Sequence, residues 1–214
     1  MGISLKKGQG VSLKKEGSSL SRLTIGLGWD VAKPKGLLNK VFGKTEDYDL
    51  DAICFMLGED GCVQDLGEVE NGRQTLLGGD VIFFNSMKHP SGAVQLTGDN
   101  RTGDGDGDDE QIMVQLDQLP ANYHRLVFVV SIYEGVKKGQ NFGSVENAFI
   151  RAVDNNGKEL VRYDISGNAS FESYHSIIFA EVVREKGDWH FKAIGNPHRS
   201  DRFVEILKSY LPKQ

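Results

Sequence analysis

The sequence of 214 residues has few of the residues that mark several common classes of protein. Proline (5) and cysteine (2) are scarce, which argues against a disordered proline-rich chain and against a disulfide scaffold. No apolar run reaches the 18 or so residues that a membrane-spanning helix needs, and the N-terminus lacks the apolar segment of a signal peptide. The net charge of −5 gives no support for nucleic-acid binding. We therefore expect a cytoplasmic protein with no membrane span and no nucleic-acid partner.

The two cysteines do not form a convincing pair. Cys54 and Cys62 fall on opposite arms of a predicted hairpin turned at residues 58–61. In that register Cys54 would face Asp65, so the two thiols would be out of reach of each other, and no histidine lies close by to complete a zinc site. We interpret both as core or turn thiols, which makes direct thiol chemistry a weak alternative.

What the chain does have is glycine (26) and many short apolar stretches separated by turn signals. Residues 125–133 form the most hydrophobic stretch and are expected to be a central strand. Ten to twelve such stretches with almost no helical periodicity predict an all-β fold, an antiparallel β-sandwich of two sheets. Near the C-terminus, apolar residues at helical spacing predict one short helix capped by Ser200 or Asp201; it packs on the sandwich or is a detachable partner helix. Short edge strands are expected near the N-terminus, where lysines protect an edge or form a basic patch for a partner.

An acidic, glycine-rich loop at residues 98–110 is the most unusual feature. It reads Gly-Asp-Asn-Arg-Thr-Gly-Asp-Gly-Asp-Gly-Asp-Asp-Glu and carries six carboxylates against one positive charge. Interleaved glycines let a backbone curl tightly, and calcium takes six to eight oxygen ligands without strict geometry. The loop therefore predicts a calcium site, although a solvated acidic loop or linker would have the same composition.

The loop does not follow the EF-hand pattern. If it began at Asp104, Asp109 would occupy the sixth position, where glycine is required, and Gln115 the twelfth, where glutamate belongs. If it began at Asp99, Arg101 would occupy a ligand position. The flanks also look like strands, and the negative field disfavours a phosphate cradle.

A second acidic group precedes the apolar stretch 52–57. On a strand, the side chains at positions 47, 49 and 51 point to the same face. Three carboxylates at the mouth of a buried strand are costly by themselves, so we interpret residues 47–51 as the other half of a cation site, which Asp30 also reaches.

Several motifs, in order along roughly residues 1–195, resemble the signature of the TerD family of bacterial tellurium-resistance and stress proteins. They are Gly-Leu-Gly-Trp-Asp (26–30), Asp-Leu-Asp-Ala (49–52), Gly-Asp-Asn-x-Thr-Gly (98–103), Gly-Asp-Asp-Glu (107–110), Gln-Asn-Phe-Gly (140–143) and Asn-Ala-Phe-Ile-Arg (147–151). The segment 31–44 is longer than is usual in the family, and the chain after residue 195 departs from its usual ending. We therefore divide the chain into a TerD-type sandwich, 1–195, and a helical extension, 196–214.

The resemblance implies a calcium-binding sandwich with clustered ion sites, two ions in our interpretation, and no established catalytic activity. The ligands that it implies are Asp30, Asp49, Asp51, Asp99, Asn100, Asp106, Asp108, Asp109 and Glu110, with Asp104 as an added acidic neighbour.

The function that follows is a non-enzymatic calcium-binding protein of the tellurite and chemical-stress resistance system, whose partners are other proteins of that system. Two alternatives stay open. One is a metal-dependent hydrolase that uses the same carboxylates, although no histidine accompanies the acidic loop and no Gly-x-Ser-x-Gly motif occurs. The other is a purely structural interaction module.

Overall fold

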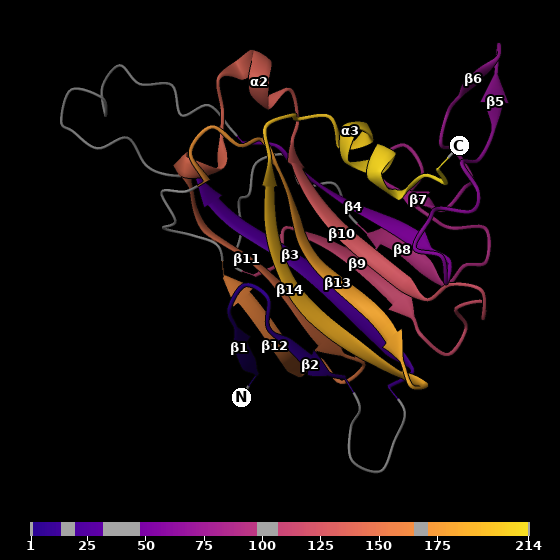
Figure 1. The fold of residues 1–214 in the computed structure, drawn as a ribbon. Helices are drawn as coiled ribbons and strands as arrows, with labels where there is room; N and C mark the ends of the chain where they lie inside the picture. Colours follow the sequence, from indigo (N-terminus) through magenta and orange to yellow (C-terminus); the bar gives the residue numbers. More distant parts are fainter. Residues whose placement is uncertain (1, 14–19, 32–47, 98–106, 165–170, 214) are drawn as a thin grey trace.

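Two large sheets face each other, and a short helix lies on the outside of one of them (Figure 1). The structure is a computed structural model that describes residues 2–13, 20–31, 48–97, 107–164 and 171–213. The expected β-sandwich is confirmed. Among the described residues, no helix is long and apolar enough to cross a membrane.

Sheet A has six strands in the order β1-β12-β11-β3-β9-β8. Their bounds are β1 Ile3–Leu5, β12 Glu159–Asp164, β11 Val145–Asp154, β3 Arg22–Val31, β9 Glu110–Gln115 and β8 Val94–Thr97. The β1–β12 pairing is parallel, and the other strand pairs that the structure describes are antiparallel. Strands β11 and β12 form the hairpin expected at the Asp-Asn-Asn-Gly turn, residues 154–157.

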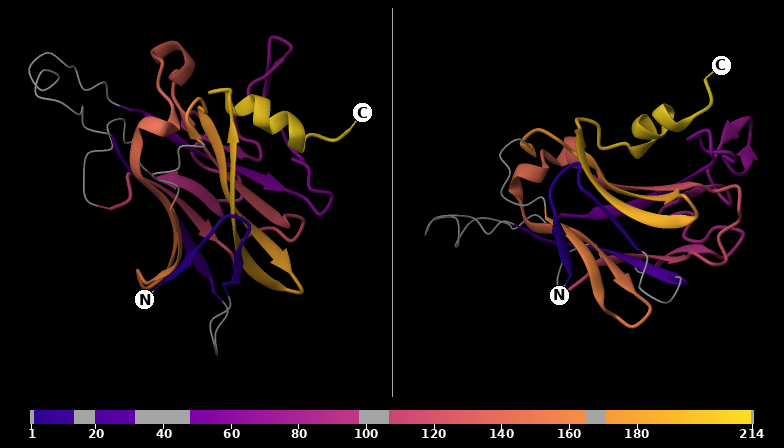
Figure 2. Two further views of the ribbon diagram at one scale, coloured as in Figure 1. Left: turned by 60° about the vertical axis from the view of Figure 1, so that its left-hand side comes forward. Right: turned by 60° about the horizontal axis from the view of Figure 1, so that its bottom comes forward.

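Sheet B has six strands in the order β2-β14-β13-β10-β4-β7. Their bounds are β2 Gly10–Ser12, β14 Asp188–His198, β13 Ser176–Glu185, β10 Arg125–Ile132, β4 Leu50–Leu57 and β7 Val81–Ile82. Strand β10 lies between β13 and β4, as its hydrophobicity predicts, and β1 and β2 lie at sheet edges. A small hairpin of β5 (Val69–Glu70) and β6 (Arg73–Gln74) stands apart from both sheets (Figures 1 and 2).

All eight residues of β4 are buried because each face of this strand meets apolar side chains. Leu50, Cys54 and Met56 belong to the core between the sheets, which also holds Leu27 of β3. On the other face, Phe55 belongs to a second apolar cluster on the outside of sheet B. The side chains on the outer face of β4 are therefore buried by this second cluster, just as those on the inner face are buried by the core.

The C-terminal helix covers this second cluster. Helix α3 (Phe203–Leu207) continues into the 3₁₀ turn η3 (Lys208–Tyr210), and the rings of Phe203 and Tyr210 lie 6.4 and 5.7 Å from that of Phe55. The packed helix is thus confirmed, but the cap is not: the N-cap residue is Arg202, and it makes no side-chain cap.

Among the elements whose bounds the structure gives, two short helical ones were not expected from the sequence. They are α2 (Gly135–Lys138), which follows β10, and the 3₁₀ turn η1 (Phe142–Ser144), which precedes β11. Asn141 Oδ1 accepts a hydrogen bond from the N–H of Gly143 and caps η1.

The predicted hairpin of residues 52–57 with 62–66 is wrong. Strand β4 pairs with β10 and β7, so Cys54 faces Ile82. The backbone N–H groups of Gln64 and Asp65 instead donate to the carboxylate of Asp80, at 3.0 and 2.8 Å. The amides of this segment thus bond to a buried carboxylate and not to a neighbouring strand. The sequence pattern does not reveal such a contact.

The Asp80 carboxylate also accepts hydrogen bonds from the Tyr123 hydroxyl (2.5 Å) and His89 Nε2 (3.2 Å). Burial raises the pKa of Asp80, but the hydrogen bonds from His89, Tyr123, Asp65 and Gln64 outweigh burial and hold the pKa below 3.8. Because the folded chain favours the ionised form, the carboxylate stabilises the fold above the ordinary aspartate pKa. That contribution is lost as the pH falls through the lowered pKa.

We therefore expect Asp80→Asn to lower the free energy of unfolding by about 2–3 kcal/mol at neutral pH, since hydrogen bonds to charged groups are lost. The difference from wild type should shrink as the pH falls from the ordinary aspartate pKa through the lowered pKa of the folded chain, where Asp80 becomes protonated. Urea unfolding of both chains across this pH range measures it. Tyr123→Phe, which keeps the carboxylate, should retain most of the pH dependence. A pH-independent difference for Asp80→Asn would contradict the prediction.

Candidate metal centre

Three strands from the two sheets bring acidic residues to one end of the sandwich. Strand β3 ends just after Asp30, and β9 begins antiparallel to it at Glu110, which pairs with Leu27. Strand β4 begins at Leu50, and Glu110 contacts its backbone at Ala52. The described acidic residues Asp30, Asp51 and Glu110, which lie far apart in the sequence, are thus all at or near these strand ends.

Glu110 links the two sheets. Its side chain is 2 % exposed, and its Oε2 accepts a hydrogen bond of 2.6 Å from the backbone N–H of Ala52. Strand β7 pairs with β4 only at Cys54 and Phe55, so the amide of Ala52 lies beyond that ladder and is bonded by the carboxylate. Burying a carboxylate is costly unless hydrogen bonds or a cation compensate for the lost water.

Asp109 is fixed to β3 through both its backbone and its side chain. Its N–H donates to the carbonyl of Leu27 (2.8 Å), and its Oδ2 accepts from the N–H of Trp29 (2.9 Å). Both contacts come from the Gly-Leu-Gly-Trp-Asp motif. That motif therefore holds the last residues of the acidic loop in place.

Asp108 points to the outer face of sheet A. Its Oδ1 accepts from Arg151 Nε (2.7 Å) and its Oδ2 from Gln111 Nε2 (3.2 Å). Its side chain is 2 % exposed and lies over Gly26, where an added Cβ would clash with the carboxylate. The hydrogen bond to Asp108 raises the pKa of Arg151. Only glycine fits at position 26, because the Asp108 carboxylate lies directly against its Cα. Through Arg151, Asp108 also holds the loop on β11.

The other described candidates lie around this end but face different ways. Asp30 is exposed, and its Oδ2 accepts a hydrogen bond of 2.6 Å from Asn147, a residue with φ of 51° at an irregularity of β11. Asp51 is 9 % exposed and lies on the outer face of sheet B, beside Ser131. Asp49 lies one residue before β4, and its backbone carbonyl accepts a hydrogen bond of 2.8 Å from the N–H of Tyr133.

Four of the ten predicted ligands lie outside the described residues: Asp99, Asn100, Asp104 and Asp106. Within the described ranges, no three His, Cys, Asp or Glu side chains are close enough together to hold a metal ion. The donor set that is present has the hard oxygen chemistry of a calcium site. Asp109 and Glu110 accept hydrogen bonds from backbone amides, whereas both oxygens of Asp108 are bonded by side chains.

Some supporting residues were not identified from the sequence alone. Arg151 and Gly26 fall inside quoted motifs, but their contact with Asp108 depends on the pairing of β11 with β3, which a single sequence does not reveal. Asn147 also falls inside a motif, but nothing in the sequence indicates its contact with Asp30 or that of Gln111 with Asp108.

The buried thiol of Cys54 offers little chemistry of its own. Cys54 and Cys62 are both free, and Cys54 is fully buried. Burial raises the pKa of the Cys54 thiol far above its usual range, which suppresses the reactive thiolate. Cys62 lies at the 58–62 turn, where its N–H donates to Asp60.

A comparison with protein families matches residues 1–210 to the TerD domain. The tellurium resistance protein TerX of Serratia marcescens is 56 % identical over 213 residues, covering 99 % of this chain and all of that protein. The stress response protein SCP2 of Bacillus subtilis is 42 % identical over 214 residues, again covering 99 % of this chain and the whole relative. These names describe resistance and stress proteins, and none names an enzyme.

Solved structures show the same fold. A crystal structure of a TerD homologue from Streptomyces coelicolor has a TM-score of 0.63 and 21 % identity, covering 91 % of this chain and all of the other. At this level of identity the likeness concerns the fold alone.

Proposed function

Since the chain belongs to the TerD domain family, we propose that it is a non-enzymatic calcium-binding protein of the bacterial tellurite and chemical-stress response. The observation that carries this proposal is Glu110, a buried carboxylate at the end of the acidic loop that reaches the first residues of β4. Family membership supports the biological setting, and the carboxylates support the ion. Other proteins of the same resistance system are its proposed partners.

In this proposal, loop 98–110 supplies most of the oxygen ligands, and Asp109 and Glu110 are the ligands whose placement is fixed by β3 and β4. Asp30, Asp49 and Asp51 are the candidates at the neighbouring strand ends. Asp108 acts mainly by holding the loop, because Arg151 and Gln111 already bond both its oxygens. When bound, calcium would cancel repulsion among the carboxylates, which at about 4 Å amounts to roughly 1 kcal/mol per pair in water and more near a protein surface.

Calorimetric titration of chelator-stripped protein with calcium, and separately with magnesium, tests the proposal. We expect about micromolar affinity for calcium, selectivity over magnesium because the many flexible oxygens suit the larger ion, and a stoichiometry of two. At a free calcium concentration of about 100 times Kd, mass action adds about 2.7 kcal/mol of stability, or roughly 5–10 °C in Tm for a chain of this size. No binding, or equally weak binding of both ions, would contradict the proposal.

A further inference from the structure

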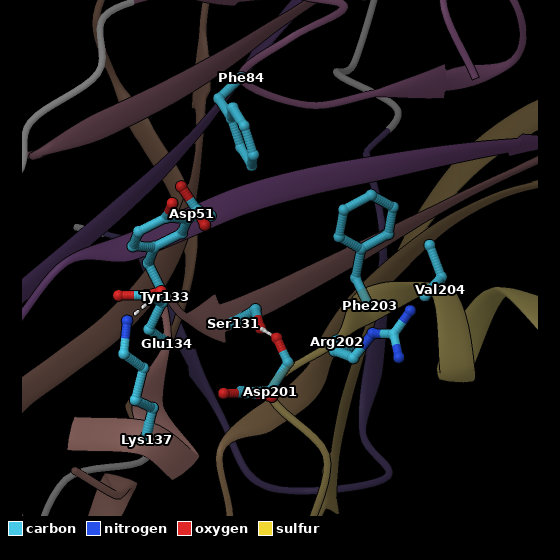
Figure 3. A pocket seen from close by; sticks show the side chains of 10 residues that line it. All are labelled: Asp51, Phe84, Ser131, Tyr133, Glu134, Lys137, Asp201, Arg202, Phe203 and Val204. Atoms are coloured by element: carbon cyan, nitrogen blue, oxygen red, sulfur yellow. Dashed lines mark hydrogen bonds and ion pairs between the residues drawn. The ribbon is translucent and has the colours of Figure 1, made fainter. Parts of the chain in front are cut away.

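A pocket opens on the outer face of sheet B, next to the C-terminal helix (Figure 3). Its volume is about 440 Å³, within the range of small-ligand sites. Asp51 of β4 and Ser131 of β10, which pair in register, lie on the strand side of it. Phe84, Tyr133 and Phe203 supply aromatic surfaces around the same space. The lining is thus largely apolar, with a buried carboxylate at its base.

The segments that form the pocket are tied to one another before any ligand binds. Ser131 Oγ donates to the carbonyl of Asp201 (2.6 Å), which holds the approach to α3 on the sheet. Asp201 Oδ2 accepts from the N–H of Val136 (3.0 Å), which joins that approach to α2. The rings of Phe84 and Tyr133 meet edge to face with centroids 6.2 Å apart. A ligand would therefore meet a pocket whose walls are already fixed relative to one another.

The charges of the lining favour a cation. Three carboxylates, those of Asp51, Glu134 and Asp201, face two basic side chains. Lys137 Nζ contacts Glu134 Oε1 at 2.8 Å, and the guanidinium of Arg202 lies on the Val204 side, across the space from Tyr133 (Figure 3). Lys137 and Arg202 are exposed, whereas Asp51 is buried. The most deeply buried charge in the lining is therefore negative.

The aromatic surfaces favour the same kind of ligand. Aromatic faces attract cations, and Lys138 already lies 5.2 Å from the centroid of the Tyr133 ring. Tyr133 is nevertheless 44 % exposed, so much of its surface is accessible to a ligand. An apolar stem bearing a cationic head would match both the apolar walls and the carboxylate beneath them.

We propose that this pocket binds an alkyl-guanidinium group, from either a free small molecule or an arginine side chain of a partner protein. The stem packs between Phe84 and Phe203, and the planar head lies against Tyr133 near the carboxylate of Asp51. A guanidinium suits the site because it is planar, weakly hydrated, stacks on aromatic rings and can bond a carboxylate with two N–H groups. The pocket shares Asp51 with the candidate calcium ligands, but the proposed binding of the guanidinium needs no calcium ion.

The test compares three probes of similar size in chelator, by titration monitored through backbone amide NMR shifts: n-butylguanidinium, the neutral isostere n-butylurea, and n-pentanoate. We expect only the guanidinium to shift amides of residues 131–137 and 201–204 in a saturable way, and to bind at least tenfold more tightly than the urea. A Gly-Gly-Arg-Gly-Gly peptide distinguishes the sources: tighter binding than the bare probe assigns the site to a partner's arginine, and weaker binding to a free small cation.

Two variants localise the binding. Tyr133→Leu, at a largely exposed position, should weaken binding about three- to thirtyfold through loss of the cation–π contact. Asp51→Asn should weaken it about tenfold or more through loss of the charge-assisted hydrogen bonds. The control Glu59→Gln makes the same charge change at a separate surface cavity formed by residues 58–60, 64, 122 and 124, and should leave binding unchanged.

Several results would overturn the proposal. They are equal binding of the urea and the guanidinium, preferential binding of pentanoate, shifts confined to other parts of the chain, and unchanged affinity in folded Tyr133→Leu. Because calcium is removed by chelator throughout, failure here would leave the calcium proposal unaffected. Conversely, a chain that binds no calcium could still bind the guanidinium.

Discussion

Replacing Glu110 with glutamine is expected to abolish most of the stabilisation by calcium while leaving the calcium-free fold intact. The glutamine carbonyl can still accept the hydrogen bond from the N–H of Ala52, so the link between the sheets persists. The charge that attracts the ion is lost. In chelator, Tm should stay close to that of wild type, whereas the rise of roughly 5–10 °C on adding calcium should largely disappear.

Glu110→Ala provides the matched contrast. It removes both the charge and the acceptor, which leaves the amide of Ala52 without its hydrogen bond and a gap at a site that is 2 % exposed. We expect this variant to lose about 2–4 kcal/mol of stability even in chelator. Thermal melts of the three chains, with and without calcium, separate the two roles. A Glu110→Gln chain that calcium stabilises as strongly as wild type would remove Glu110 from the set of ligands.

Breaking the Asp108–Arg151 ion pair is expected to destabilise the chain equally with and without calcium. Asp108 is 2 % exposed and Arg151 29 %, so the pair is only partly screened by water. Asp108→Asn should cost about 1.5–3 kcal/mol, the usual range for a hydrogen bond between charged groups. A double-mutant cycle with Arg151→Met, measured by urea unfolding, should give a coupling energy of about 1 kcal/mol or more.

The Arg162–Asp164 pair is the control, because its N–O distance of 2.8 Å is similar but its side chains are 34 and 45 % exposed. Asp164→Asn should cost no more than about 1 kcal/mol. If Asp108→Asn instead lowers stability only in calcium, Asp108 is a ligand rather than an anchor of the loop. If it has no effect in either condition, the ion pair does not stabilise the loop.

The sequence allows much of the fold to be predicted because the long strands carry their own signals. Strand β3 alternates strictly, with Leu23, Ile25 and Leu27 in the core, and the Asp-Asn-Asn-Gly turn fixes the hairpin of β11 and β12. The helical spacing of Phe203, Ile206, Leu207 and Tyr210 correctly predicts a C-terminal helix packed on the sandwich. The structure shows that it covers sheet B.

Sequence-based prediction fails where a side chain distant in the sequence, and not the neighbouring residues, decides how a segment is bonded. The sequence predicts residues 62–66 as the second arm of a hairpin, but the amides of Gln64 and Asp65 donate to Asp80. The carboxylate of Asp80 also contacts Tyr123 and His89. Asp51 is predicted as a member of the acidic group at the start of β4, and the sequence does not reveal what else surrounds it. The C-terminal helix packs on that face of the strand and makes Asp51 the base of a pocket.

The sequence by itself determined the sandwich, the acidic character of residues 98–110 and the family, because alternation, turn residues and motif spacing are local properties. Only the tertiary structure decided what each carboxylate contacts. Asp108, Asp109 and Glu110 are consecutive, yet they reach Arg151, the amide of Trp29 and the amide of Ala52. Successive side chains of an extended chain point in different directions, and strand pairing between residues far apart in the sequence decides what each of them meets.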